Sequence, residues 1–102
     1  MNTLTSAPTL QVNEEGYLKN YQDWNRDWAT EIAHQYNISL TPKHWDVLNW
    51  LRAKQAEGTA LSVRKVGNSG IVDIKEFYAL FPGGPLKISS RIAGIPKPAS
   101  CI

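Results

Sequence analysis

The sequence contains one cysteine, Cys101, which is followed only by Ile102. In its thiolate form a cysteine is a nucleophile that exchanges with disulfides and persulfides. A lone cysteine cannot form a disulfide within its own chain, so its chemistry would be a persulfide, a mixed disulfide or another adduct with a partner. Arg91 and Lys97 could support the thiolate, whereas the carboxylate of Ile102 opposes it. From the residues alone, Cys101 could also be a cysteine that is exposed by chance and has no chemical role.

The two histidines, His34 and His44, are the remaining candidates for metal binding or base catalysis. Neither has another histidine or a carboxylate three or four residues further on, and one thiol cannot complete a four-ligand zinc site. We therefore expect no metal and no cofactor, and we favour two ordinary surface or half-buried histidines over a Cys–His pair. The Gly-containing segment 67–70 lacks the lysine, strand and helix of a phosphate-binding loop.

Composition indicates a single compact domain over residues 1–102, because 42% of the residues are hydrophobic and 20% are charged. We find no basic leader followed by an apolar stretch and no run long enough to cross a bilayer, so we expect a cytoplasmic location and no membrane partner. The net charge is −3 up to Leu51 and +5 beyond it. This asymmetry is compatible with an anionic partner or with an ordinary solvated surface.

The first half of the chain predicts a hairpin followed by two helices. Residues 1–9 are expected to be frayed, and the stretch 10–18 reads as two short strands around a turn at Gly16. Asn25 and Thr41 are suitable N-caps for helices that end near Asn37 and Gly58. Four tryptophans lie at helical intervals, which is typical of core and rim positions rather than of a base-stacking platform. They are Trp24, Trp28, Trp45 and Trp50.

The second half predicts two more helices and an extended tail. Residues 59–71 mix strand and loop signals, so we treat them as irregular. Asp73 is the expected cap of a helix that stops at the segment 82–84, and Pro85 opens a last helix that runs to Gly94. Two prolines in the segment 95–102 favour a mobile, extended arm. The predicted fold is thus mainly α, a small orthogonal helical bundle with an N-terminal β-hairpin and a flexible C-terminal arm.

Four segments of the chain resemble, in order, the signature segments of the DsrC/TusE family of sulfur relay proteins. The most specific is the C-terminal run Arg-Ile-Ala-Gly-Ile-Pro-Lys-Pro-Ala-Ser-Cys-Ile at 91–102. The other three are Glu-Gly-Tyr-Leu at 15–18, Ile-Ser-Leu-Thr-Pro-Lys-His-Trp at 38–45 and Leu-Phe-Pro-Gly-Gly-Pro at 80–85. The resemblance implies a small helical fold with an N-terminal hairpin.

The same resemblance implies a function for Cys101, which matches the penultimate cysteine of the family. That cysteine accepts sulfane sulfur as a persulfide from an upstream donor protein and passes it to a downstream acceptor, such as a tRNA 2-thiouridine synthesis enzyme. Family members linked to dissimilatory sulfite reductase carry a second cysteine eleven residues earlier. Here that position is Ser90, so the chain resembles the TusE type, which has only the penultimate cysteine.

Two other functions remain as alternatives. The chain could be an accessory, gamma-type subunit or partner of dissimilatory sulfite reductase in sulfur oxidation or reduction, if Cys101 acts there without a second thiol. It could also be a helix-turn-helix-like nucleic-acid-binding module, because two helices with a short linker are followed by a basic half. Direct nucleic-acid binding is disfavoured, since the second helix carries only Lys43, Arg52 and Lys54 as basic residues.

Overall fold

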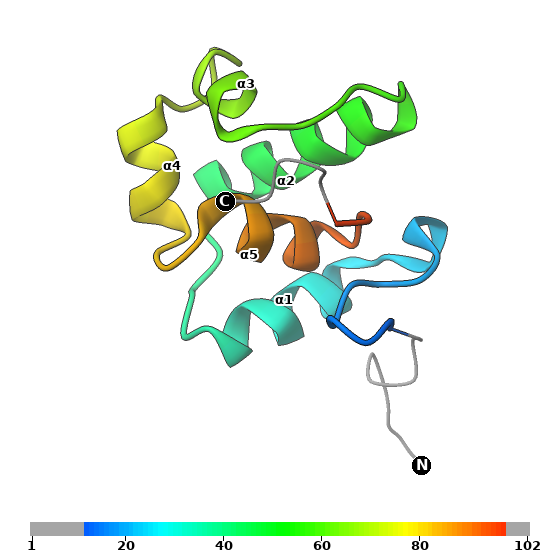
Figure 1. Cartoon of the computed structure of the whole chain (residues 1–102). Helices are drawn as coiled ribbons and strands as arrows, with labels where there is room; N and C mark the ends of the chain where they lie inside the picture. Colours follow the sequence, from blue (N-terminus) through cyan, green and yellow to red (C-terminus); the bar gives the residue numbers. More distant parts are fainter. Residues whose placement is uncertain (1–11, 98–102) are drawn as a thin grey trace.

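The computed structural model describes residues 12–97. Within this range the chain is helical, as predicted, with five α-helices and a 3-10 helix, η2 (Tyr21–Asp23) (Figure 1). The α-helices are α1 (Arg26–Gln35), α2 (Pro42–Ala56), α3 (Val63–Gly67), α4 (Ile74–Leu80) and α5 (Pro85–Ala93). No helix in the described part is long and apolar enough to cross a membrane.

The predicted N-terminal β-hairpin is wrong for the described residues, which contain a tight turn but no strand. One isolated antiparallel bridge joins Val12 to Leu18, and Gly16 has the expected positive φ, 86°. The Asn13 side chain accepts hydrogen bonds from the backbone N–H groups of Glu15 and Tyr17. Because this local bonding occupies donors that a strand ladder would use, the segment closes on itself instead of extending.

The caps predicted for the first two helices are confirmed. The Asn25 side chain accepts from the Trp28 N–H at the start of α1, and Asn37 takes the left-handed conformation after its end. Thr41 forms a capping box with His44, and Pro42 occupies the first turn of α2. These caps could be predicted from the sequence because each capping side chain binds a residue within the first turn of its helix.

The stretch that we expected to be irregular contains the short helix α3. Ser62 caps it by accepting from the Lys65 N–H, and Val66 is buried in the core. Five residues are too few for a 3.6-residue period to stand out in the sequence. A Cβ on Gly67 would lie 2.4 Å from Cγ1 of Ile74, so the glycine that resembled a loop signal is a point of close approach between α3 and α4.

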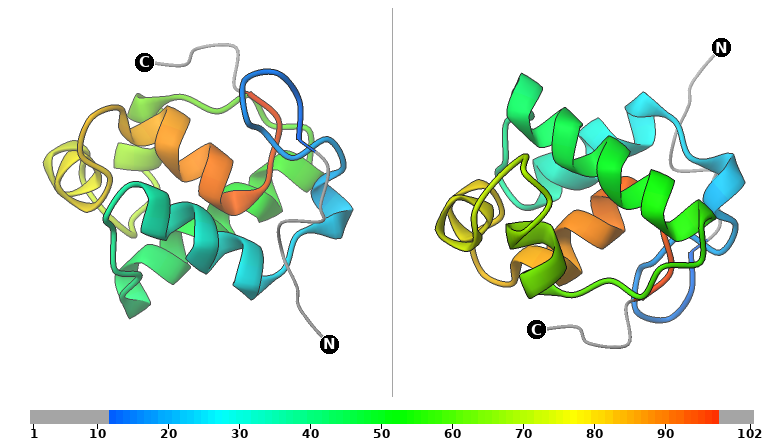
Figure 2. Two further views of the ribbon diagram at one scale, coloured as in Figure 1. Left: turned by 90° about the horizontal axis from the view of Figure 1, so that it is seen from below. Right: turned by 90° about the horizontal axis from the view of Figure 1, so that it is seen from above.

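Helix α5 is the centre of the fold, between α1 and α2 and in contact with α4 (Figure 2). Its predicted start at Pro85 and end at Gly94 are confirmed. Most of its side chains are buried, including Leu86, Ile88 and Ile92, and they belong to a single hydrophobic cluster that also takes residues from all the other α-helices. Helix α5 is therefore held by packing against α1, α2 and α4, and the segment that follows it starts from a well-packed helix.

Candidate functional site

The C-terminal motif begins on α5, and its described part, residues 91–97, is called the tail root here. Cys101 lies outside the described residues, as do the rest of 98–102. The tail root is therefore the described structure closest in sequence to the thiol. It ends beside the turn at residues 13–17, so the two ends of the described chain lie side by side (Figures 1 and 2).

The expected arm at 95–102 does not begin at Ile95. This side chain is 0% exposed and belongs to the core, whereas Pro96 and Lys97 are exposed. Gly94 adopts the left-handed conformation with φ 70°, the Ile95 N–H donates to the Ser90 carbonyl and the Gly94 N–H to that of Arg91. This is a Schellman motif, which turns the chain back so that the residue after the glycine packs on the helix.

Three side chains from distant elements bind the last three carbonyl groups of α5. The Trp28 indole donates to Arg91 O at 3.1 Å, and the Trp24 indole donates to Ile92 O at 2.8 Å. Arg52 Nη1 donates to Ala93 O, also at 2.8 Å. Carbonyls at a helix C-terminus have no partner within the helix. Arg91 O also accepts from the Gly94 N–H, whereas the side-chain donors satisfy Ile92 O and Ala93 O, and together these bonds fix the tail root in place.

Arg52 is the only one of these donors that carries a charge, and it is half-buried on α2. Its Nη2 donates to Tyr21 O at 2.9 Å, and its guanidinium carbon lies 4.3 Å from the ring centroid of Trp24. Burial lowers the pKa of Arg52, and the nearby Tyr21 opposes that effect. The side chain remains protonated at neutral pH, because an arginine titrates far above it.

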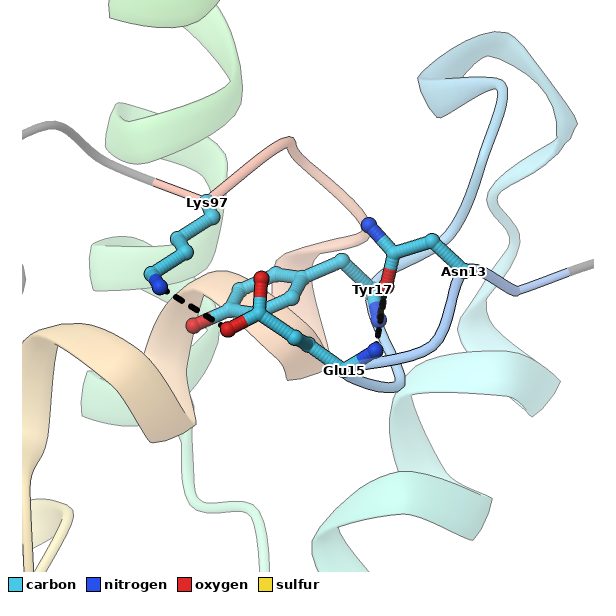
Figure 3. Close-up of polar contacts among 4 residues, drawn as sticks. All are labelled: Asn13, Glu15, Tyr17 and Lys97. Atoms are coloured by element: carbon cyan, nitrogen blue, oxygen red, sulfur yellow. Dashed lines mark hydrogen bonds and ion pairs between the residues drawn. The ribbon is translucent and has the colours of Figure 1, made fainter.

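The two cations proposed to support the thiolate both bind the N-terminal part of the chain. Arg91 Nε donates to Gly16 O at 3.3 Å, and the same guanidinium donates to the Tyr36 hydroxyl. Lys97 Nζ lies 2.8 Å from Glu15 Oε2, and Figure 3 shows this pair beside the ring of Tyr17. The Lys97–Glu15 pair is solvent-exposed, so it contributes at most about 1 kcal/mol. A role for Arg91 or Lys97 toward the Cys101 thiolate stays a prediction.

The two histidines differ in their surroundings, since His44 is held within the fold and His34 is exposed. His44 is buried, its Nδ1 lies 3.1 Å from Thr41 N, and its Nε2 lies 2.9 Å from Leu80 O. The carbonyl can only accept, so we assign the proton to Nε2. The ring also packs edge-on against Phe81. His34 is exposed on α1, and a pair of either histidine with Cys101 would involve a residue outside the described part of the chain.

The four sequence segments singled out above meet in pairs at the two ends of α5. The segment 15–18 contacts the tail root through Arg91 and Lys97, whereas the segment 38–45 contacts 80–85 through His44. A model of the family described as "DsrC like protein" matches residues 5–102. The chain belongs to the DsrC family.

Relatives of known structure confirm the DsrC fold. The solution structure of DsrC from Allochromatium vinosum has a TM-score of 0.76 and 40% sequence identity, and it covers 91% of this chain and 90% of that one. The oxidized gamma-subunit of dissimilatory sulfite reductase (DsrC) from Archaeoglobus fulgidus has a TM-score of 0.77 and 31% identity, with coverages of 91% and 92%. The chain is also 36% identical to the sulfurtransferase TusE of Escherichia coli, over 91% of this chain and 93% of that protein.

Ser90, which the family resemblance places at the position of a second cysteine, lies inside the fold. It is 0% exposed, and its hydroxyl has no hydrogen-bond partner among the residues that the structure describes. The neighbouring Ser89 is equally buried, but its hydroxyl donates to Leu86 O at 3.2 Å. A buried hydroxyl without a partner is destabilising because it loses its bonds to water and gains none in return.

Replacing Ser90 with alanine is therefore expected to raise the free energy of unfolding by about 1 kcal/mol, through loss of the unpaired hydroxyl and a better helix propensity. In a domain of this size that corresponds to a rise of roughly 4–8 °C in Tm, measurable by circular dichroism. Ser89→Ala is the matched control and should show no such gain, because it removes a formed hydrogen bond. A Tm for Ser90→Ala below that of the wild type would contradict the argument.

Proposed function

We propose that this DsrC-family protein is a sulfur relay protein that carries a persulfide on Cys101. The observation that supports it best is the lone cysteine within a family signature, in a chain similar to a sulfurtransferase over most of its length. The Cys101 thiolate attacks the outer sulfur of a donor protein's persulfide. One S–S bond forms, one breaks, and the donor leaves as a thiolate, so no oxidant or reductant is needed.

The tail root supports this function by limiting where the thiol can be. Cys101 follows Lys97 by four residues, and an extended chain covers at most about 3.6 Å per residue. The thiol-bearing residue thus stays within roughly 14 Å of Lys97. A donor or acceptor would have to dock close to Lys97, where the tail root lies beside the turn at 13–17 and the segment 55–61.

We further propose that the protein acts in the cytoplasm as a single domain. Its donor would be an upstream protein that carries a persulfide, and its acceptor would be an enzyme that thiolates tRNA. Similarity to TusE and the absence of a second cysteine support this choice. The net charge of +5 beyond Leu51 is compatible with an acidic donor or a tRNA-bound acceptor.

A partnership with sulfite reductase is the second candidate, and the similarity to the Archaeoglobus fulgidus gamma-subunit favours it. Ser90 opposes it, since a hydroxyl cannot form the disulfide or trisulfide that a second thiol allows. The nucleic-acid alternative loses support because the basic residues of α2 are already bound. Lys43 donates to Ile71 O, Arg52 to two backbone carbonyls, and Lys54 pairs with Glu57.

The relay is tested by intact mass. After incubation with a persulfide donor, the wild type should gain about 32 Da per transferred sulfur, and dithiothreitol should remove it. Cys101→Ser should remain folded and gain no mass, whereas Ser100→Ala, its neighbour control, should behave as the wild type. Reductant-sensitive sulfur on Cys101→Ser would exclude Cys101 as the carrier.

A further inference from the structure

Arg52 connects three parts of the molecule through one side chain. It extends from α2 and donates to Ala93 O in the tail root and to Tyr21 O in η2, at 2.8 and 2.9 Å. Its guanidinium also lies over the ring of Trp24, whose own indole N–H binds the adjacent carbonyl, that of Ile92. Arg52 thus fixes the position of the last turn of α5 relative to the segment before α1.

The choice of an arginine here is informative. An apolar side chain would fill the space without taking a charge partly out of water. What an arginine adds is directional: its planar fork binds two carbonyls at once, whereas a lysine presents a compact point charge. Ala93 O is the last carbonyl of the helix, and the chain reverses at the following residue, Gly94. A bond at this carbonyl therefore constrains the orientation in which the chain leaves the helix.

We propose that Arg52 is a positioning residue for sulfur transfer, which sets the direction in which the chain leaves α5 and thereby where Cys101 meets its partners. This inference rests on the proposed function. Arg52 need not touch the thiol or the sulfur, since it acts through Ala93 O and through Trp24. Its loss should leave the thiol reactive toward small molecules but poorly placed for transfer between proteins.

The variants are chosen to separate positioning from folding. Arg52→Gln removes the charge and the fork, and Arg52→Lys keeps the charge and the aliphatic stem but not the fork. Arg26→Gln is the matched control, because Arg26 also stacks on a tryptophan, 4.0 Å from the Trp45 centroid, and is exposed. Within residues 12–97, no hydrogen bond or ion pair joins Arg26 to the tail root. All measurements are made at a temperature at which circular dichroism shows the variant folded.

The first readout is the 2-thiouridine content of tRNA in Escherichia coli cells that lack their own TusE and express this protein instead. The wild type and Arg26→Gln should restore thiolation, and Arg52→Gln should lower it at least tenfold at equal protein level. The alkylation rate of Cys101 by iodoacetamide should stay within twofold in all of them. Failure of the wild type itself would count against the proposed acceptor and leave the positioning role to the second readout.

The second readout needs no partner. A nitroxide attached to Cys101 broadens the amide NMR signals of nearby residues, so the set of broadened signals reports where the label lies. In folded Arg52→Gln that set should change, with signals elsewhere in the body unmoved, while Arg26→Gln keeps the wild-type set. If Arg52→Gln does not fold, Arg52→Lys is measured instead and should show the same change. An unchanged set in the folded variant would overturn the inference.

Discussion

Truncation after Gly94, which removes residues 95–102, is expected to lower the free energy of unfolding by about 3 kcal/mol. The reason is Ile95, which is fully buried in the core and whose N–H donates to Ser90 O. Removal of a fully buried isoleucine side chain typically costs about 2–5 kcal/mol. The corresponding fall in Tm is roughly 12 °C or more, measured by calorimetry or circular dichroism.

Truncation after Lys97 is the matched control for this experiment. It retains Ile95, the Schellman motif and the Lys97–Glu15 pair, so every contact described above survives. We expect its Tm to stay within a few degrees of the wild type, in keeping with an arm that begins beyond Ile95. Equal destabilisation by the two truncations would mean that residues 98–102 account for the whole loss and that Ile95 contributes nothing, which would contradict that arrangement.

Gly94→Ala is expected to lower the free energy of unfolding by about 2–3 kcal/mol. A left-handed backbone costs an alanine roughly 1–2 kcal/mol, and here φ is 70°. In addition, the new Cβ would lie 2.5 Å from Cδ1 of Trp24, which is closer than two carbon atoms can approach. The indole would have to move and lose its bond to Ile92 O, which adds about 1 kcal/mol.

Gly58→Ala separates the two contributions. Gly58 also follows a helix and has a positive φ, 80°, but nothing lies within 4 Å of a Cβ placed on it. Its substitution should therefore cost only the backbone penalty, roughly 1–2 kcal/mol. Urea unfolding of both variants gives the difference directly. Equal losses at positions 58 and 94 would mean that Trp24 moves aside without cost.

Local signals explain which parts of the fold could be predicted. Asn25, Thr41 and Asp73 each cap a helix by a bond within three residues, so the sequence alone contains both partners. The stop at Gly94 is equally local. The prediction of a hairpin was wrong for a related reason. The Asn13 side chain binds backbone N–H groups of its own turn and so competes with strand pairing, which the alternation of apolar residues does not reveal.

The candidate site was only partly predictable. Cys101 could be proposed as the functional residue because its chemistry and its motif both lie in the sequence, and its role stays a prediction. The donors to α5 could not, since Trp24, Trp28 and Arg52 are 68, 63 and 41 residues away from the carbonyls that they bind. The tryptophans were correctly read as core and rim residues, but their indole N–H groups cap the helix as well. No sequence period encodes such a pairing.

The anchored tail root also has a kinetic consequence. The thiol-bearing residue stays within about 14 Å of Lys97, so it and the reactive group of a docked partner share roughly a half-sphere of that radius above the protein surface. One reactive group in that volume corresponds to an effective concentration of up to roughly 0.3 M. Once a partner has docked, the meeting of the two sulfur atoms is an intramolecular event. Brief and weak docking would then suffice for transfer, and the carrier could leave quickly for its next partner.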